Sequence, residues 1–459
     1  MKALSLILLL LYLFCPYALR AQSSNFQRLY GTNLNNSFTK TLRSGTSYYV
    51  LGRDEPTAGA LNRATVTRLD AQGQHQWTLR LDIASQWNDA VVTPNGNLLL
   101  VGHTLPFDAN CQSLAAVVTA AGAFSWVRSY NAPGRESFTR VARNLSPNNG
   151  AFPYYILGNQ WDPDGNATWD DVVLLTMSEA GNFGWKKRYT GLFGTADDEF
   201  ARDLEALPNG DLILAGNLGT NGVVFRADNT GSIYNATGPE GLSFSFADVT
   251  QTSGGFLAVG NSFPSVLAFL IKFDSDLLPQ WQINLPNLTA ISQVWRDGGN
   301  GIYVTGRATI ASLNRGVVLK FQDRGNTPPL LLWMKYLDNK EVAYTGGSSW
   351  YLPPSQLAFN DGRNTSERAF MSVSDLDMNT CMTKEGVVST MSADLLFNSP
   401  VPPGIEFVDV PMGTNVTLSS AVNWQQEDAC PDPMDASIAG TKYRECGNLP
   451  YTNQPTVPD

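Results

Sequence analysis

Histidine is almost absent from this chain: His75 and His103 are the two histidines among 459 residues. Zinc sites and Ser-His-Asp triads depend on histidine, and both histidines stand at ordinary positions of the repeat described below. The sequence also contains no glycine-rich phosphate loop and no Cys-x-x-Cys motif. We therefore predict no catalytic residue, and these absences favour a protein that is not an enzyme, although they leave the question open.

Basic residues and long apolar runs are also scarce. Lys and Arg number 31 against 41 Asp and Glu, which gives a net charge of −10. Nucleic acids and anionic membrane surfaces attract proteins through basic patches, so neither is a predicted partner. Beyond the N-terminus, no segment approaches the roughly 20 apolar residues that span a bilayer, so we do not expect a membrane-spanning protein.

One apolar run stands at the N-terminus, from Ala3 to Cys15 after the basic Lys2. A basic start, an apolar core and a small residue before the cut are typical of a secretory signal, which we place at residues 1–21. Lipid attachment at Cys15 is disfavoured by the bulky Phe14 before it. We expect a secreted, soluble protein, periplasmic or at the extracellular cell surface.

Cysteine is sparse, with four residues after the signal: Cys111, Cys381, Cys430 and Cys446. An even number of cysteines in an oxidising compartment can pair, and the sequence does not choose among three connectivities. Cys430 and Cys446 are close in sequence and flank a Pro/Asp-rich stretch, so they are the preferred disulfide.

A short apolar run that ends in glycine recurs along the chain. The six copies are YYVLG ending at Gly52, LLLVG at Gly102, YYILG at Gly158, LILAG at Gly216, FLAVG at Gly260 and IYVTG at Gly306. A seventh copy, SWYLP, ends at Pro353. The spacing between successive copies lies between 44 and 58 residues, which is the length of one supersecondary unit. We call these the anchor runs.

The same elements surround each anchor run. A tight turn such as TPNGN precedes it, and a variable loop, a second apolar strand and a polar turn follow it. The unit then closes with a strand that opens on an aromatic residue such as Trp77, Trp126 or Trp185. Four short strands in up-and-down order, with one packed aromatic per unit, indicate a β-propeller blade. A β-solenoid and two stacked sandwiches are the alternatives.

The start of the mature chain resembles the last strand of a blade that no earlier blade precedes. FQRLYG, from Phe26, matches the Trp-led fourth strand, and the seventh unit runs out after its third strand near Cys381. We therefore predict an all-β, seven-bladed β-propeller over residues 22–381, closed by the N-terminal strand. Residues 382–446 are expected to form a small β-rich appendage or partial sandwich, and residues 447–459 a linker or disordered tail.

Two kinds of known repeat share these motifs. The units LDAQGQHQW and SEAGNFGW are similar to quinoprotein-type propeller repeats, although the adjacent-cysteine pair of many quinone-dependent dehydrogenases is absent. The combination of W-x-x-x-Y, a Gly-ended strand and D-x-x-G-x-x-x-W more closely resembles the secreted repeat propellers of Bacteroidota. In that family, propellers often head surface proteins that carry adhesion domains. The resemblance covers residues 26–381 and implies a propeller fold.

One acidic loop, QWDPDGNATWDD, stands out between the second and third strands of its unit. Around Gly165 it gathers hard oxygen ligands that calcium prefers: Asp162, Asp164, Asn166, Asp170 and Asp171. On the EF-hand spacing, however, the first ligand position falls on Gln160, and Asp-Gly-Asn is also a common turn sequence. A calcium site and a plain acidic surface loop both remain open, and we expect no cofactor unless this loop binds calcium.

The connections between strands two and three and between successive units are long and variable, and a propeller places them on one side. We call this side the long-loop face and the other the short-turn face. Binding generally occurs on variable loops of a rigid scaffold, and the predicted binding residues are Trp161, Trp169, Phe193, Phe263, Asp54 and Arg307. We expect a non-catalytic adhesion module for a surface glycan or protein. A propeller glycosidase or lyase with loop carboxylates and a structural assembly scaffold are the alternatives.

Overall fold

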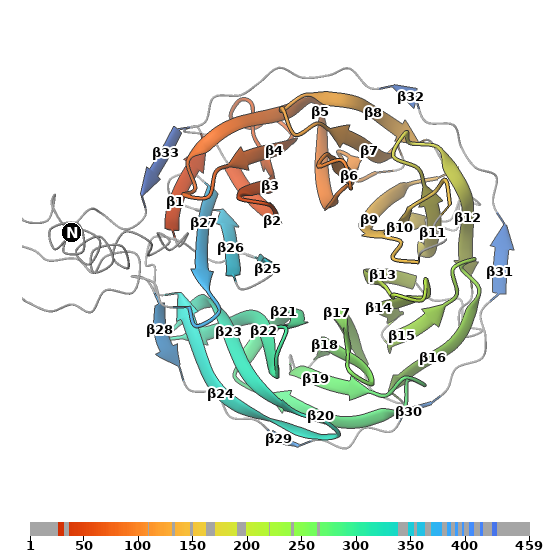
Figure 1. Cartoon of the computed structure of the whole chain (residues 1–459), viewed down its shortest axis with the longest axis vertical. Helices are drawn as coiled ribbons and strands as arrows, with labels where there is room; N and C mark the ends of the chain where they lie inside the picture. The colour runs from red at the N-terminus through yellow and green to blue at the C-terminus, as the bar shows by residue number, and fades with distance from the viewer. Residues whose placement is uncertain are drawn as a thin grey trace, which may run out of the picture.

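The computed structural model describes residues 26–31, 36–108, 110–130, 134–146, 150–161, 170–190, 199–219, 221–239, 243–263, 267–337, 348–352, 356–362, 369–378, 383–386, 391–392, 397–398, 404–407, 414–415 and 425–428. All regular elements in these ranges are β-strands, so the predicted all-β class is confirmed. The strands form small antiparallel sheets arranged in a ring around a common axis (Figure 1). Within the described residues, no helix has the length and apolar character needed to cross a membrane.

The first sheet contains eight strands and joins two four-stranded units. In order these are β2 (Asn36–Ser44), β3 (Ser47–Asp54), β4 (Arg63–Leu69), β5 (His75–Val92), β6 (Leu98–Thr104), β7 (Ser113–Val118), β8 (Phe124–Tyr130) and β32 (Thr414–Asn415). The 18-residue β5 pairs with β4 through its first half and with β6 through its second half. It is therefore the outermost strand of one unit and the innermost strand of the next.

Four further sheets each have five strands, ordered here from the ring axis outward. One contains β9 (Glu136–Arg143), β10 (Tyr154–Trp161), β11 (Asp170–Met177), β12 (Phe183–Thr190) and β31 (Gly404–Phe407). The second contains β13 (Glu199–Ala206), β14 (Leu212–Leu218), β15 (Asn221–Ala227), β16 (Ile233–Pro239) and β30 (Phe397–Asn398). The third contains β17 (Ser243–Thr252), β18 (Gly255–Phe263), β19 (Ala268–Phe273), β20 (Pro279–Leu285) and β29 (Met391–Ser392). The fourth contains β21 (Leu288–Arg296), β22 (Gly301–Ile310), β23 (Leu313–Arg324), β24 (Thr327–Leu337) and β28 (Thr383–Gly386).

The last sheet brings together the two ends of the described chain. Its order is β25 (Ser348–Leu352), β26 (Gln356–Gly362), β27 (Ala369–Asp375), β1 (Phe26–Gly31) and β33 (Gln425–Asp428). β1 pairs antiparallel with β27, with Phe26 opposite Val373 and Tyr30 opposite Ala369. The first described strand is thus hydrogen-bonded to β27, the third strand of the seventh repeat unit.

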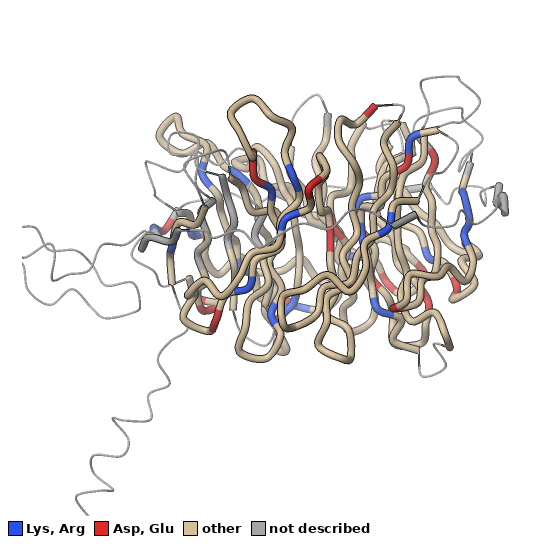
Figure 2. The backbone as a smooth tube through the Cα atoms, turned by 90° about the horizontal axis from the view of Figure 1, so that it is seen from above, with Lys and Arg blue, Asp and Glu red and all other residues tan. Residues whose placement is uncertain are grey.

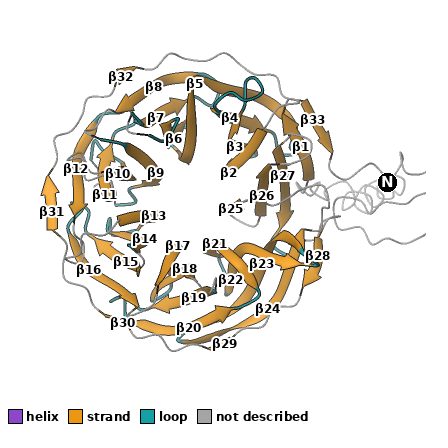
Figure 3. Cartoon of the chain, turned by 180° about the vertical axis from the view of Figure 1, so that it is seen from behind, coloured by secondary structure: helices purple, strands orange, loops and turns teal. Residues whose placement is uncertain are grey.

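The region after Cys381 was expected to be a small β appendage packed on the ring or a partial sandwich. Its described strands, β28 to β33, pair singly with the outermost strands of different sheets and lie outside the ring (Figures 1 and 3). They share no sheet of their own. We call these six strands the C-terminal strap. The strands are only two to four residues long, too short for the alternating pattern that would reveal their pairing in the sequence.

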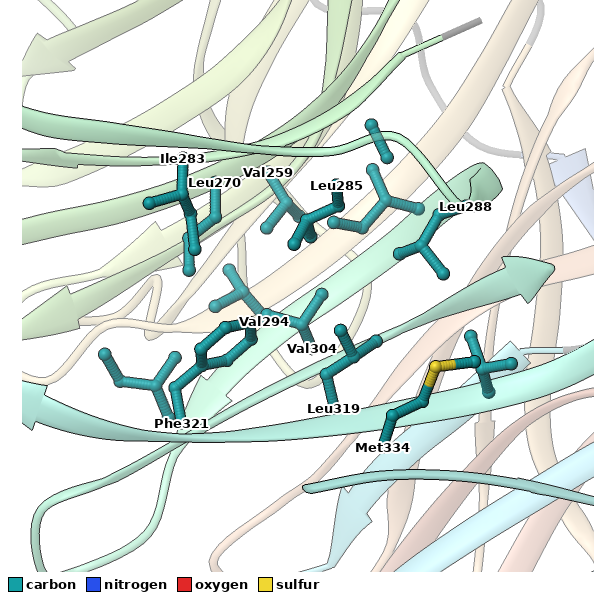
Figure 4. Close-up of a cluster of buried hydrophobic side chains, with 14 of the residues drawn as sticks. Val259, Leu270, Ile283, Leu285, Leu288, Val294, Val304, Leu319, Phe321 and Met334 are labelled. Atoms are coloured by element: carbon teal, nitrogen blue, oxygen red, sulfur yellow. The ribbon is translucent and has the colours of Figure 1, made fainter. Parts of the chain in front are cut away.

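The hydrophobic core lies between neighbouring sheets. Figure 4 shows one such layer, in which Ile283 and Leu270 of one sheet face Val304 and Phe321 of the next. All four side chains are at most 3% exposed. Seen from the side, the ring is a disc, and acidic and basic residues occur along the backbone toward both faces (Figure 2). Burial between sheets explains why the second and third strands of the units, such as β6 and β7, read as nearly continuous apolar runs.

In four units the aromatic residue near the start of the outer strand packs on a turn glycine of the next unit. A Cβ atom on Gly73 would collide with the ring of Phe26, and one on Gly122 with the ring of Trp77. Trp126 with Gly181 and Trp185 with Gly231 repeat this contact. The recurring tryptophan is therefore a packing element, as its periodic spacing indicates.

The glycine of each anchor run lies beside a β-bulge of the innermost strand. In six units the pairing register shifts by one residue at this point. A Cβ on Gly102 would overlap the carbonyl oxygen of Gln86, and one on Gly216 that of Phe200. The bulge directs this carbonyl toward the glycine, which explains why the anchor run ends in the residue without a side chain.

Candidate functional site

The innermost strands carry polar side chains at one shared position, directly after the bulge. We call them the inner polar ring: Lys40, Asp89, Arg140, Asp203, Asp248 and Gln293. Their side chains are largely removed from solvent, since Asp89 is 2% exposed and Asp248 8%. Buried charged groups at one register of successive strands call for partners.

The aspartates of the ring bind the backbone of the following unit. Oδ2 of Asp89 accepts a hydrogen bond from Val141 N at 2.9 Å, and Oδ2 of Asp248 one from Val294 N at 2.7 Å. Oδ2 of Asp203 does the same with Val249 N at 3.1 Å. Each of these aspartates therefore accepts a hydrogen bond from an innermost strand of the following unit, two residues after its bulge.

The cations of the ring bind the same aspartates from the other side. Lys40 forms an ion pair with Oδ1 of Asp89, and Arg140 Nε lies 3.1 Å from Oδ1 of Asp203. Burial, together with the neighbouring Asp203 carboxylate, raises the pKa of Asp248 well above its usual range. These carboxyl groups therefore serve contacts between units. They are poorly placed to act as the acid and base of a hydrolase, because their oxygens are already engaged.

A second group of side chains lies on the long-loop face. The guanidinium carbon of Arg135, just before β9, lies 3.3 Å from the ring centroid of Trp161 and 4.1 Å from that of Phe107. Trp161 ends β10, and Phe107 belongs to the loop between β6 and β7. We call these three residues the aromatic–arginine stack. A cation close to two aromatic faces is held by both ring quadrupoles.

Backbone hydrogen bonds hold the stack in place. Trp161 N donates to Arg135 O at 2.7 Å, and Arg135 Nη1 donates to Phe107 O at 3.2 Å. The loop of Phe107 is attached to β9 as well, because Glu136 N donates to Cys111 O at 3.3 Å. The three side chains come from two neighbouring units, and these bonds make their arrangement a property of the framework rather than of one loop.

Buried polar groups support the stack from below. Glu136 forms an ion pair with Lys186 and accepts a hydrogen bond from Ser113 Oγ at 3.0 Å, and all three are at most 2% exposed. Burial lowers the pKa of His103 to about 4, with help from the Arg135 charge. His103 is thus neutral near pH 7. Its Nδ1 lies 3.0 Å from Asn88 Nδ2.

The stack offers a partner a flat aromatic surface with one positive charge. Phe107 is 46% exposed and Trp161 is partly exposed. Aromatic and arginine side chains held rigidly at a surface contribute strongly to recognition, because little conformational entropy is lost on binding. The arrangement suits binding. It provides no nucleophile, acid or base.

The structure locates some of the predicted binding residues in different settings. Trp161 belongs to the stack, whereas Asp54 is 2% exposed and lies 3.0 Å from Arg80 in a buried ion pair. Asp54 is therefore an interior group, and its burial raises its pKa. Arg307 lies within β22 and is partly buried. Trp169, Phe193 and the side chain of Phe263 lie outside the described residues.

Most of the predicted calcium and disulfide residues lie outside the described part of the chain: Asp162, Asp164, Asn166, the side chain of Asp170, Cys430 and Cys446. Asp171 is described, and its carboxylate lies 3.5 Å from Arg188 Nε. Cys111 is a buried free thiol, and no cluster of His, Cys, Asp or Glu in the described ranges fits a metal ion. Calcium at this loop and the Cys430–Cys446 bond stay predictions.

Sequence reasoning missed the inner polar ring, Phe107 and Arg135. The ring had a detectable signal, because five of its members stand 12 or 13 residues before an anchor glycine. Phe107 and Arg135 stand in loops without periodicity, so no pattern relates them to Trp161.

Comparison with known proteins gives structural likeness alone. No family model and no curated protein matches the chain. A protein of unknown function from Bacteroides caccae is similar at 11% identity and a TM-score of 0.39, over 67% of this chain and 94% of that one. The β-propeller domain of Nup133 from Vanderwaltozyma polyspora is similar at 9% identity and a TM-score of 0.41, over 73% of this chain and 100% of that one. Prolyl oligopeptidase B from Galerina marginata is similar at 10% identity and a TM-score of 0.45, over 80% of this chain and 52% of that one. No function follows from these scores.

Proposed function

We propose that the chain is a seven-bladed β-propeller, closed by β1, that acts as a non-catalytic binding module at a cell surface. The partner contacts the long-loop face, and the favoured partner is a surface glycan. Export by the signal at residues 1–21 belongs to the same proposal, as does a role at the outside of the cell.

Seven units follow when the eight-stranded sheet is counted as two blades that share β5. Each half of β5 then has the role that a separate strand has in the other blades. Closure is supported by a repeated contact, because Tyr30 Oη donates to Gly73 O at 2.6 Å just as Tyr189 Oη donates to Gly231 O at 2.6 Å. β1 thus contacts the following unit as the outer strand β12 does.

The observation that carries the binding function is the aromatic–arginine stack. It joins residues of two units on the face with the longest loops. Phe107 is exposed and Arg135 and Trp161 are partly exposed, although each has backbone contacts that fix it. Flat aromatic groups with a few directed polar groups are typical of ligand sites. Sugar rings present one apolar C–H face and outward hydroxyl groups, which match these two kinds of surface.

The test measures binding of the purified chain to an array of cell-surface oligosaccharides. We expect binding by the parent chain and a loss of about tenfold or more in affinity for Phe107→Ala, equivalent to about 1.4 kcal/mol. The matched control is Leu278→Ala on the short-turn face, where Leu278 is 56% exposed. It should bind like the parent, and both variants should keep the parent melting temperature.

Equal binding by Phe107→Ala and the parent would remove the stack as the contact. Absence of glycan binding, together with stack-dependent binding to cells that is lost after protease treatment of those cells, would identify a protein partner instead. Arginine and aromatic residues are also enriched at protein interfaces. Hydrolysis of an arrayed glycan would favour the glycosidase alternative. A chain without any partner would support the structural scaffold.

A further inference from the structure

The C-terminal strap visits the sheets in the reverse of their chain order. β28 pairs with β24, β29 with β20, β30 with β16, β31 with β12 and β32 with β8. The last strap strand, β33, then pairs with β1. The described strap strands therefore lie around the outside of the ring, and the last one lies on the sheet next to the one where the strap begins (Figure 1).

The end of the strap meets the strand that closes the ring. Residues 26–30 of β1 pair with β27 on one edge, and residues 28–31 pair with β33 on the other. Arg28 is opposite Asp428, and Gly31 is opposite Gln425. β1 is thereby held between two strands, whereas without β33 it would be the outermost strand of its sheet.

Each strap strand is weak when considered alone. A strand such as β29 or β30 has only two residue pairs. Ordering a residue costs roughly 1–2 kcal/mol of backbone entropy, and a hydrogen bond returns about 0.5–1.5 kcal/mol. The net stability from any one strap strand is consequently small. Its position decides what it does, and β33 alone occupies the free edge of the closing strand.

We propose that the C-terminal strap is a lock on the closed ring, and that β33 is its latch. The ring opens when β1 separates from β27. Because β33 pairs with the other edge of β1, β1 is released as a single strand only after β33 has also separated from it. The lock slows opening more than it raises the equilibrium stability. This inference rests on the closure by β1 proposed above and is independent of the binding function.

The test compares two full-length variants that remove backbone donors from the strap. Gln426→Pro with Glu427→Pro disrupts the latch, because proline has no N–H for a strand partner. Phe397→Pro with Asn398→Pro makes the same change in β30, in the middle of the strap. Hydrogen exchange of the amides of residues 26–31 is followed by mass spectrometry under native conditions, together with the unfolding rate in denaturant.

The latch variant should exchange the amides of β1 about tenfold faster or more and unfold faster, whereas the β30 variant should stay within about twofold of the parent. Unchanged exchange of β1 in the latch variant would overturn the proposal. Equal acceleration in both variants would also overturn it, because the strap would then be a general edge cover.

A measurement on the unmodified chain keeps the proposal testable if the latch variant fails to fold. The amides of residues 425–428 should exchange before those of β1 or together with them. Loss of protection in β1 while β33 stays protected would contradict the lock. If closure by β1 were itself wrong, β1 would already exchange at the rate of an unstructured segment in the parent.

Discussion

At the scale of single residues, two kinds of close contact explain why glycine recurs at fixed positions of the repeat. An anchor glycine faces the carbonyl of a bulge, as Gly102 does with Gln86, and a turn glycine faces an aromatic ring, as Gly122 does with Trp77. Both contacts require a residue without a side chain, because a neighbouring atom already occupies the space of the Cβ atom. Backbone and side-chain packing thus determines where glycine recurs in the sequence.

Gly102→Ala tests the anchor contact. The added methyl group has no room beside the Gln86 carbonyl, so we expect the free energy of unfolding to fall by about 1–3 kcal/mol, the usual cost of overpacking. Denaturant melts give this value. Gly298→Ala is the matched control, since nothing lies within 4 Å of its Cβ position, and it should change little. Similar effects at both positions would refute the bulge explanation.

Glu205 makes stability depend on pH. Burial, reinforced by the nearby Asp203 carboxylate, raises the pKa of Glu205 from 4.5 to about 7, although Gln251 N donates to its Oε2 at 3.0 Å. The folded state therefore binds this proton more tightly than the unfolded state does. Its contribution to stability is fully present below pH 4.5 and is lost as the pH rises toward 7.

Glu205→Gln should remove this dependence. The difference in unfolding free energy between variant and parent should shift in favour of the variant, on the order of 2 kcal/mol, between pH 4.5 and 7. Chemical denaturation at several pH values measures the difference. Parallel curves for the two proteins would show that Glu205 titrates alike in the folded and unfolded states.

At the scale of elements, the outer strand of each unit is tied to a turn of the next. Tyr130 Oη donates to Gly181 O at 3.0 Å, and Trp281 Nε1 donates to Gly325 O at 3.1 Å. The inner strands are tied separately, through aspartates such as Asp89 that bind the following bulge. Two sets of bonds, one near the axis and one near the rim, therefore join neighbouring sheets.

The pair Tyr30→Phe and Tyr189→Phe compares β1 with an ordinary outer strand. Each change removes one buried hydroxyl bond of 2.6 Å to a turn carbonyl, at a net cost of about 1 kcal/mol. Equal losses in thermal or denaturant unfolding would support the role of β1 as the fourth strand of the seventh unit. A neutral Tyr30→Phe beside a costly Tyr189→Phe would contradict it.

Elements of this fold differ in how well sequence predicts them. The four-strand repeat was predictable because each unit must satisfy the same packing. The role of β1 was predictable because FQRLYG has the sequence pattern of an outer strand, although it lies far along the chain from the other strands of its sheet. The pairing of the strap strands with separate sheets was not predictable, since strands as short as β29 carry no alternation. Asp54 looked like a loop ligand because the ion pair with Arg80 depends on strand pairing, which charge patterns do not display.

At the scale of the whole molecule, the ring has two faces and a rim, and these have different uses. The strap strands occupy the outer edges of six strands at the rim, which removes edges that would otherwise pair with other chains. The short-turn face is made largely of tight hairpins. The long-loop face is left as the individual surface of this protein, and the aromatic–arginine stack lies on it.

The closure of the ring is the central claim, because the strap lock and the arrangement of the faces both depend on it. A cysteine pair, Gln27→Cys with Ser372→Cys, tests it most directly, since these residues are opposite each other in β1 and β27. Opposite residues of antiparallel strands have Cα atoms roughly 4.5–5.5 Å apart, within the range that a disulfide spans. Gln27→Cys with Ser374→Cys, two residues out of register, is the control.

The measurement is the fraction of cross-linked chain after mild oxidation, read by mass spectrometry of the linked peptide. The account predicts near-complete linkage of residues 27 and 372, a higher melting temperature in the oxidised form, and little linkage of residues 27 and 374. No linkage of the first pair, or equal linkage of both pairs, would contradict a ring closed by its N-terminal strand.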